Sequence, residues 1–368
     1  MLERLGCALT ALLLLTACGD AGPDTVTFAT VDLPDGSAPV TVAVTGDGLV
    51  VGVRREGQPT VPGLLRRRAD GVLTAIPVRA AGPYGRLARW VSLSIVDSRV
   101  VALGGERGGA HGNVRWSVWG GSLAEGVEEQ PQGFSTFGGY GAGDLVEAVQ
   151  TPEAALLVGS WEGRRVGMDA AVWTPDGDTW NRRSSAGTVL ESTPDALAFP
   201  TSAAAHRSDV LVAGWELAGT PVPVVWRLTG GEWTKTALPD AGSNGTASAI
   251  RCQDNECAVA GRVDGKLALW QLTDERWERI GGAPPIEVND KDRMTAPIWI
   301  DGQVTQVYAE GGRVKIAQHQ DGNWTVRHLT GPTGTVAEVI SIGNSVYVLA
   351  GQDENDQTLW WADIATPR

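Results

Sequence analysis

One pattern recurs seven times along this chain and restricts its fold more than any other feature: an apolar run that closes on Gly or another small residue. Successive runs lie about 40 to 55 residues apart, a period typical of four-stranded repeats stacked around an axis. Their near-continuous apolar character is typical of strands covered on both faces. The runs are LVVGV (49–53), VVALGG (100–105), ALLVGSW (155–161), VLVAGW (210–215), CAVAG (257–261), TQVYAEG (305–311) and VYVLAG (346–351).

Each apolar run has a candidate strand in front of it and two candidate strands after it. We call the four strands of a repeat a, b, c and d, and strand b is the apolar run. Because one such sheet cannot bury both faces alone, the repetition predicts an all-β, seven-bladed β-propeller with four-stranded antiparallel blades. The expected a strands, nearest the axis, are Val40–Val44, Trp90–Val96, Leu145–Gln150, Ala196–Phe199, Ala247–Arg251, Ala296–Ile300 and Val336–Ile342.

Tryptophan marks the hairpins between strands c and d. Trp173 and Trp180, Trp226 and Trp233, and Trp270 and Trp277 are all separated by seven residues around polar turns. Because they recur at matched positions, we interpret these rings as packing residues that fill the space between splayed sheets.

Two segments resemble known propeller repeats. VLVAGW (210–215) followed by VVWRLTGGEWTKTALP (224–239) is similar to the kelch repeat, although the kelch double glycine survives only as Gly104-Gly105. TPDGDTW (174–180) resembles the Asp-box of sialidase-type propellers, with one residue missing. Both resemblances imply a propeller over nearly the whole chain after its first two dozen residues.

The two ends of the chain are expected to meet in one blade. The seventh repeat has no strand d of its own, and Thr25–Leu33 precedes the first strand a without a partner. We therefore predict that this N-terminal strand completes the last blade, so that no sheet edge stays open. Six blades is the nearest alternative, because the first two repeats lack the paired tryptophans.

The N-terminus reads as an export signal. Residues 1–17 hold one arginine before a short apolar run, and Leu15-Thr16-Ala17-Cys18 resembles a bacterial lipobox. The resemblance implies cleavage before Cys18, lipid on its thiol, residues 18–24 as a tether, a propeller over 25–368, and an extracytoplasmic, membrane-anchored protein. An ordinary cleaved signal with a chance cysteine is the alternative.

Cysteine usage agrees with export, and the net charge argues against one class of partner. Apart from Cys7 and Cys18 of the predicted signal and lipobox, the chain has only Cys252 and Cys257. They flank a predicted turn between neighbouring strands, so we predict a disulfide. A net charge of −13 argues against nucleic acid.

Candidate ligand-binding residues gather where loops and the starts of the a strands meet at one mouth of the channel. In a Gly-rich loop, Phe134, Phe137 and Tyr140 could form a contact surface or fold back as a plug. Paired carboxylates at the mouth could do glycosidase work or form a solvated rim. The remaining candidates are Arg89, Trp90, Asp144, Glu147, Asp195 and Arg293.

No set of residues in the sequence matches a known catalytic or metal-binding pattern. We therefore expect a lipid-anchored, monomeric propeller that binds a protein or glycan at the cell envelope without catalysis, metal or cofactor. The alternative is a glycan-active enzyme or lectin of sialidase-like or kelch-like type.

Overall fold

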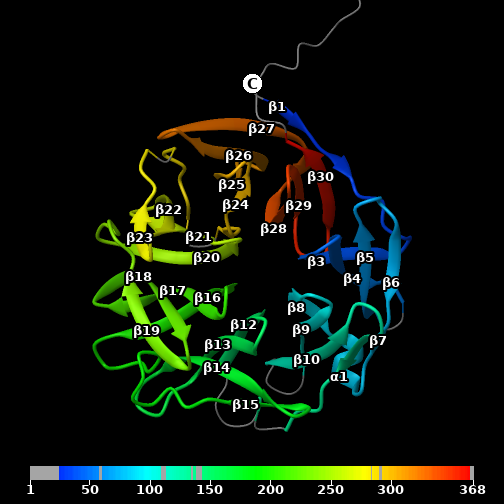
Figure 1. Ribbon diagram of the computed structural model, residues 1–368, viewed down its shortest axis with the longest axis horizontal. Coiled ribbons are helices and arrows are strands. Elements are labelled where there is room, and N and C mark those ends of the chain that lie inside the picture. Colours follow the sequence, from blue (N-terminus) through cyan, green and yellow to red (C-terminus); the bar gives the residue numbers. More distant parts are fainter. Residues whose placement is uncertain are drawn as a thin grey trace, which may run out of the picture.

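The computed structural model describes residues 25–57, 60–108, 113–133, 136–137, 143–282, 284–289 and 292–364. Seven sheets are arranged radially around a central axis (Figure 1), and in each of them consecutive strands pair antiparallel. This confirms the predicted seven-bladed propeller. The first two apolar runs, whose hairpins lack paired tryptophans, each lie in a sheet of their own, so the six-bladed alternative is wrong.

Each blade begins with the strand nearest the axis. Blades one to four contain β3 (Ser37–Thr45), β4 (Gly48–Arg55), β5 (Val61–Arg68) and β6 (Leu73–Ile76); β8 (Arg89–Val96), β9 (Arg99–Arg107), β10 (Val114–Ser122) and β11 (Gly126–Glu129); β12 (Gly143–Gln150), β13 (Ala155–Glu162), β14 (Met168–Asp176) and β15 (Thr179–Arg182); β16 (Leu197–His206), β17 (Asp209–Ala218), β18 (Thr220–Thr229) and β19 (Glu232–Ala237).

Blades five to seven repeat the arrangement, with a very short inner strand in blade six. They contain β20 (Gly245–Gln253), β21 (Glu256–Val263), β22 (Lys266–Thr273) and β23 (Arg276–Arg279); β24 (Ile298–Ile300), β25 (Gln303–Glu310), β26 (Arg313–Gln320) and β27 (Asn323–Thr333); β28 (Thr335–Ile342), β29 (Ser345–Gly351) and β30 (Gln357–Asp363). Outside this pattern, β7 (Val78–Arg79) pairs parallel with β11, and one short helix, α1 (Pro83–Leu87), precedes β8.

The N-terminal segment closes the ring, but it is shared between two blades. β1 (Thr25–Thr27) pairs parallel with β27 of blade six, and β2 (Ala29–Thr30) pairs antiparallel with Trp360 and Trp361 of blade seven. The single predicted strand Thr25–Leu33 is therefore divided. Between its halves, Phe28 is buried and donates its backbone N–H to the carbonyl oxygen of Thr330 at 2.8 Å.

The hairpin tryptophans are used unequally. The ring on strand c is fully buried in blades three, four and five (Trp173, Trp226 and Trp270). Its partner on strand d is buried in blade three (Trp180) but only half-buried in the next two (Trp233 and Trp277). The packing interpretation therefore holds fully for the inner ring of each pair and only partly for the outer one.

Candidate ligand-binding channel

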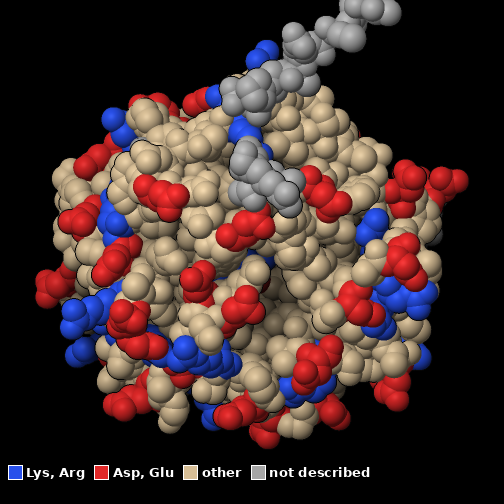
Figure 2. All heavy atoms as spheres, turned by 45° about the horizontal axis from the view of Figure 1, so that its top comes forward, with Lys and Arg blue, Asp and Glu red and all other residues tan. Residues whose placement is uncertain are grey.

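A cavity of about 840 Å³ lies on the axis, and we call it the central channel. Its walls come from the inner strands β3, β8, β12, β16, β20 and β28, together with the segment that precedes β24. Figure 2 shows the molecular surface hollowed near its centre, with acidic side chains around the hollow. The described lining has aliphatic, hydroxyl and charged side chains, and it contains no aromatic ring.

A β-bulge at the same place in six inner strands decides which residues face their neighbours in the ring. The register of each of these strands against strand b shifts by one residue. An extra residue re-aims the side chains around it. The first paired residues after the six bulges are Thr41, Ser92, Glu147, Ser202, Ala249 and Glu338.

Glu338 joins blade seven to blade one. Its Oε2 atom accepts hydrogen bonds from the Thr41 hydroxyl at 2.8 Å and from the backbone N–H of Val42 at 2.9 Å. Burial nevertheless raises the pKa of the Glu338 carboxyl, because removal from water disfavours the charged form. These two hydrogen bonds and the nearby guanidinium groups of Arg251 and Arg293 act in the opposite direction.

Glu147 occupies the equivalent position in blade three. It accepts hydrogen bonds from the Ser92 hydroxyl of blade two, from the Ser202 hydroxyl at 3.5 Å and from the backbone N–H of Ala203 in blade four. Burial, reinforced by the negative charge of Glu338, raises the pKa of Glu147 to about 7 despite these donors.

Arg251 brings a positive charge into the channel from β20. Its Nη2 donates to the carbonyl oxygen of Val339 in blade seven at 2.6 Å, reaching past the short inner strand of blade six. Its Nε–H is buried and has no hydrogen-bond partner among the described residues. Burial lowers the pKa of Arg251, while Glu338 and Glu147 partly offset this effect.

The predicted site residues divide between the channel, its rim and the core. Glu147 and Arg293 line the channel, whereas Asp144 and Asp195 are exposed outside its described lining. Arg89 reaches the b–c loop of blade seven, where it donates to the backbone carbonyl of Glu354 and lies 3.4 Å from that residue's carboxylate.

The aromatic candidates do not form an exposed surface where they are described. Trp90 is 2% exposed, donates its ring N–H to the carbonyl oxygen of Gly63 at 2.8 Å and packs edge-on against Trp119. Phe137 is 7% exposed and packs against Trp173 in the core between blades two and three. Phe134 and Tyr140 lie outside the described residues, as does Cys18.

Sequence reasoning missed Glu338 and Arg251. A signal for Glu338 was present, since TVAEVISI and GDLVEAVQ each place one glutamate directly between apolar residues in the middle of an inner strand. Arg251 stands next to the first cysteine of the predicted disulfide, and nothing in its sequence indicates that it spans blade six.

The predicted disulfide is present. Cys252 and Cys257 face each other across β20 and β21, with Cα atoms 4.1 Å apart.

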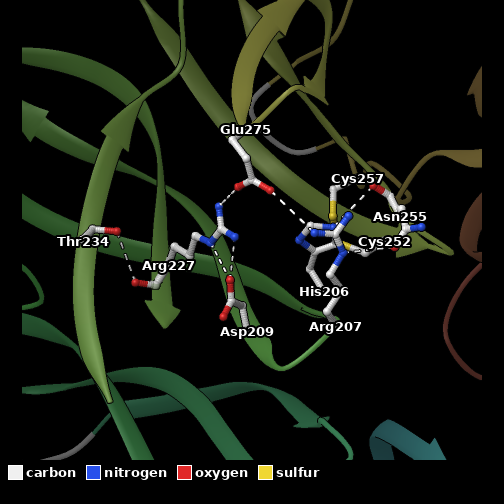
Figure 3. Close-up of polar contacts among 9 residues, drawn as sticks. All are labelled: His206, Arg207, Asp209, Arg227, Thr234, Cys252, Asn255, Cys257 and Glu275. Carbon is white, nitrogen blue, oxygen red and sulfur yellow. Dashed lines mark hydrogen bonds and ion pairs between the residues drawn. A yellow bond between two sulfur atoms is a disulfide. The ribbon is translucent and has the colours of Figure 1, made fainter. Parts of the chain in front are cut away.

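Figure 3 shows a polar cluster beside this disulfide. Arg227 binds Asp209 at 2.6 Å and also binds Glu275 of blade five. This cluster ties blade four to blade five on the side of the a–b turns.

The described residues form neither a metal-binding cluster nor a membrane-spanning helix. They contain no grouping of three or more His, Cys, Asp or Glu side chains suited to a metal ion. None of the helices formed by these residues is both long and apolar enough to span a bilayer.

Comparison with known proteins supports the fold and assigns no family. No protein-family description and no curated protein matches the sequence. Among solved structures, the β-propeller domain of the Trilobed protease from Pyrococcus furiosus has a TM-score of 0.54 at 8% identity, covering 90% of this chain and 94% of that one. A puromycin-hydrolyzing peptidase from Mycobacterium tuberculosis has a TM-score of 0.55 at 13% identity, covering 94% of this chain.

Larger enzymes share the propeller over only part of their length. A Trypanosoma rangeli sialidase matches with a TM-score of 0.48 at 10% identity, covering 81% of this chain. The chain spans 57% of that sialidase and 55% of the mycobacterial peptidase. The likeness to the two peptidase structures therefore shows a β-propeller fold and nothing finer.

Proposed function

We propose that this chain is an exported, lipid-anchored β-propeller that binds a ligand in its central channel and catalyses no reaction. The observation that carries the proposal is the group formed by Glu147, Glu338 and Arg251, three partly exposed ionisable side chains that line one open, ligand-sized cavity. Cavities of this size with a few convergent polar groups are the usual form of small-ligand sites.

The contacts of the two glutamates favour binding over catalysis. Each carboxylate accepts hydrogen bonds from a neighbouring blade, so each is fixed in place. An attack on a substrate through these oxygens would break contacts between neighbouring blades.

A glycan-active enzyme or lectin of kelch-like or sialidase-like descent is the second candidate. One observation favours it: two carboxyl groups with raised pKa values face the same cavity, as a general acid and its partner would. Assays with a panel of glycosides separate binding from glycan hydrolysis. Binding alone predicts background rates for the wild type, whereas hydrolysis that is lost in Glu147→Gln would establish the enzyme.

The membrane anchor is tested by fractionating cells. The motif at residues 15–18 predicts that the wild-type protein sediments with membranes and that Cys18→Ala is released into the soluble fraction. Cys7→Ala, a change within the predicted signal, is the matched control and should leave the protein in the membrane fraction. Wild-type protein found only in the soluble fraction would contradict the anchor.

The binding role is tested in intact cells. A photo-crosslinking amino acid replaces Val44, which lines the channel and is 39% exposed, and in a control it replaces Val72, which is 43% exposed and lies outside the described channel lining. The proposal predicts adducts from position 44 that are absent from position 72. Equal labelling from both positions would contradict binding at the channel.

A further inference from the structure

The central channel holds opposite charges that do not pair with each other. Arg251 is close enough to Glu147 and Glu338 to influence the pKa of both, yet no ion pair joins it to either carboxylate within the described residues. Because the three side chains are only partly exposed, water screens their charges less than at the open surface, and a group that bridges them would be attracted at both ends.

The unused hydrogen-bonding capacity points in two directions. Both described hydrogen bonds of Glu338 end on Oε2, which leaves its Oε1 able to accept another donor. The buried Nε–H of Arg251 requires an acceptor and finds none in the described part of the chain. A group that fits between them must donate hydrogen bonds at one end and accept them at the other.

The charge balance of the lining favours a ligand with a positive end. Glu147, Glu338 and Asp292 share the described lining with Arg251 and Arg293, so it carries three negative and two positive charges when all five groups are ionised. A bare metal ion fits poorly, because Arg251 would repel it.

We propose that the central channel binds a small zwitterion, an α-amino acid or a short peptide with free ends, and this rests on the function proposed above. The ammonium group lies against Glu338 and Glu147, and the carboxylate accepts from the guanidinium of Arg251. The aliphatic wall, which includes the exposed side chains of Val44 and Val91, contacts the side chain of the ligand.

A ligand series tests this assignment without altering the protein. The full-length chain in detergent is titrated calorimetrically with alanine, leucine, lysine and alanyl-alanine, and then with their N-acetyl and C-terminal amide derivatives. The proposal predicts binding of at least one free zwitterion and at least tenfold weaker binding after either end is blocked. Equal affinity for free and blocked forms overturns it.

Two variants assign the two ends. Glu338→Gln keeps an oxygen that can accept from Val42 and should weaken the zwitterion at least tenfold, while its effect on the N-acetyl derivative is small. Arg251→Gln should also weaken the zwitterion at least tenfold, while its effect on the C-terminal amide derivative is small. Asp195→Asn, an exposed change outside the described lining, is the control and should bind as the wild type does.

The outcomes separate this inference from the function on which it rests. If sugars or simple carboxylic acids bind in an Arg251-dependent way and zwitterions do not, the ligand class is wrong and the binding function stands. If nothing in the series binds and no adduct forms from position 44 in cells, both fail. If Glu338→Gln unfolds, the blocked-ligand series on the wild-type protein still decides.

Discussion

At the scale of single residues, Glu147 shows how a structural contact and a functional group can coincide. It accepts hydrogen bonds from blades two and four, yet burial and the charge of Glu338 raise its pKa to about 7. A glutamate whose folded-state pKa is raised stabilises the fold most when it is protonated. The stabilisation is therefore complete below pH 4.5, the ordinary value for this carboxyl, and disappears as the pH rises toward 7.

Glu147→Gln should make folding stability less dependent on pH. Glutamine cannot ionise. The decrease in the free energy of unfolding between about pH 5 and pH 8 should therefore be smaller in the variant, by up to about 3 kcal/mol, the equivalent of a shift of two to three pKa units. The variant keeps the charged and hydroxyl side chains around position 147, which are Glu338, Arg251, Ser92 and Ser202. The measurement is chemical denaturation of both proteins across this range, and parallel curves for the two would contradict the raised pKa.

At the scale of secondary structure, the glycine that closes several apolar runs is explained by the bulge opposite it. Gly214 pairs with Pro200 directly before the register shift, and a Cβ at Gly214 would lie 2.3 Å from the carbonyl oxygen of Phe199. In blade five, a Cβ at Gly261 would lie 2.1 Å from the carbonyl oxygen of Thr246. In blades four and five this close approach leaves no room for a Cβ, whereas Val53 of blade one and Ala350 of blade seven stand at the corresponding position.

Gly214→Ala should therefore destabilise blade four by about 1–3 kcal/mol or more, because the backbone must move to admit one methyl group. Gly46→Ala is the matched control, since a Cβ there meets no heavy atom within 4 Å. Thermal unfolding of both variants checks the prediction. Equal melting temperatures would show that the bulge does not restrict this position.

The sequence was sufficient to predict the blades because their determinants are local and repeated. Apolar runs, turn residues and paired tryptophans report the strands directly, and the cysteine pair lies on two neighbouring strands. The channel group could not be predicted, since Arg251 and Glu338 meet only after the ring has closed around the short β24. Trp90 was assigned to the rim, and its burial depends on the neighbouring ring of Trp119, which no local pattern reveals.

At the scale of the whole molecule, closure depends on the short N-terminal segment. Phe28 packs in the core between blades six and seven, and Val31 packs in the core between blades seven and one. Backbone bonds from Phe28 to Thr330 and from Val31 to Leu359, both 2.8 Å, fix the same segment to both blades. The segment thus joins the N-terminal part of the chain to its last two blades.

Phe28→Ala should weaken the contact of this segment with blades six and seven and destabilise the protein by about 3–5 kcal/mol, as expected for a buried phenylalanine. Thr30→Ala, an exposed change two residues further on, serves as the control and should cost less than 1 kcal/mol. Hydrogen exchange followed by mass spectrometry should show faster exchange in β27 and β30 of the Phe28 variant. Unchanged exchange there would mean that the ring closes without the segment.

The central claim, that a zwitterion binds against Glu147 and Glu338 in the central channel, is tested most directly by the protons exchanged on binding. Calorimetric titration of the full-length protein with an unblocked amino acid at pH 6, in two buffers of different ionisation enthalpy, measures this number. The account predicts proton release, because an ammonium group favours the ionised carboxyl, and predicts that Glu147→Gln reduces the release. Binding without proton exchange, or no heat of binding for any amino acid, would contradict it.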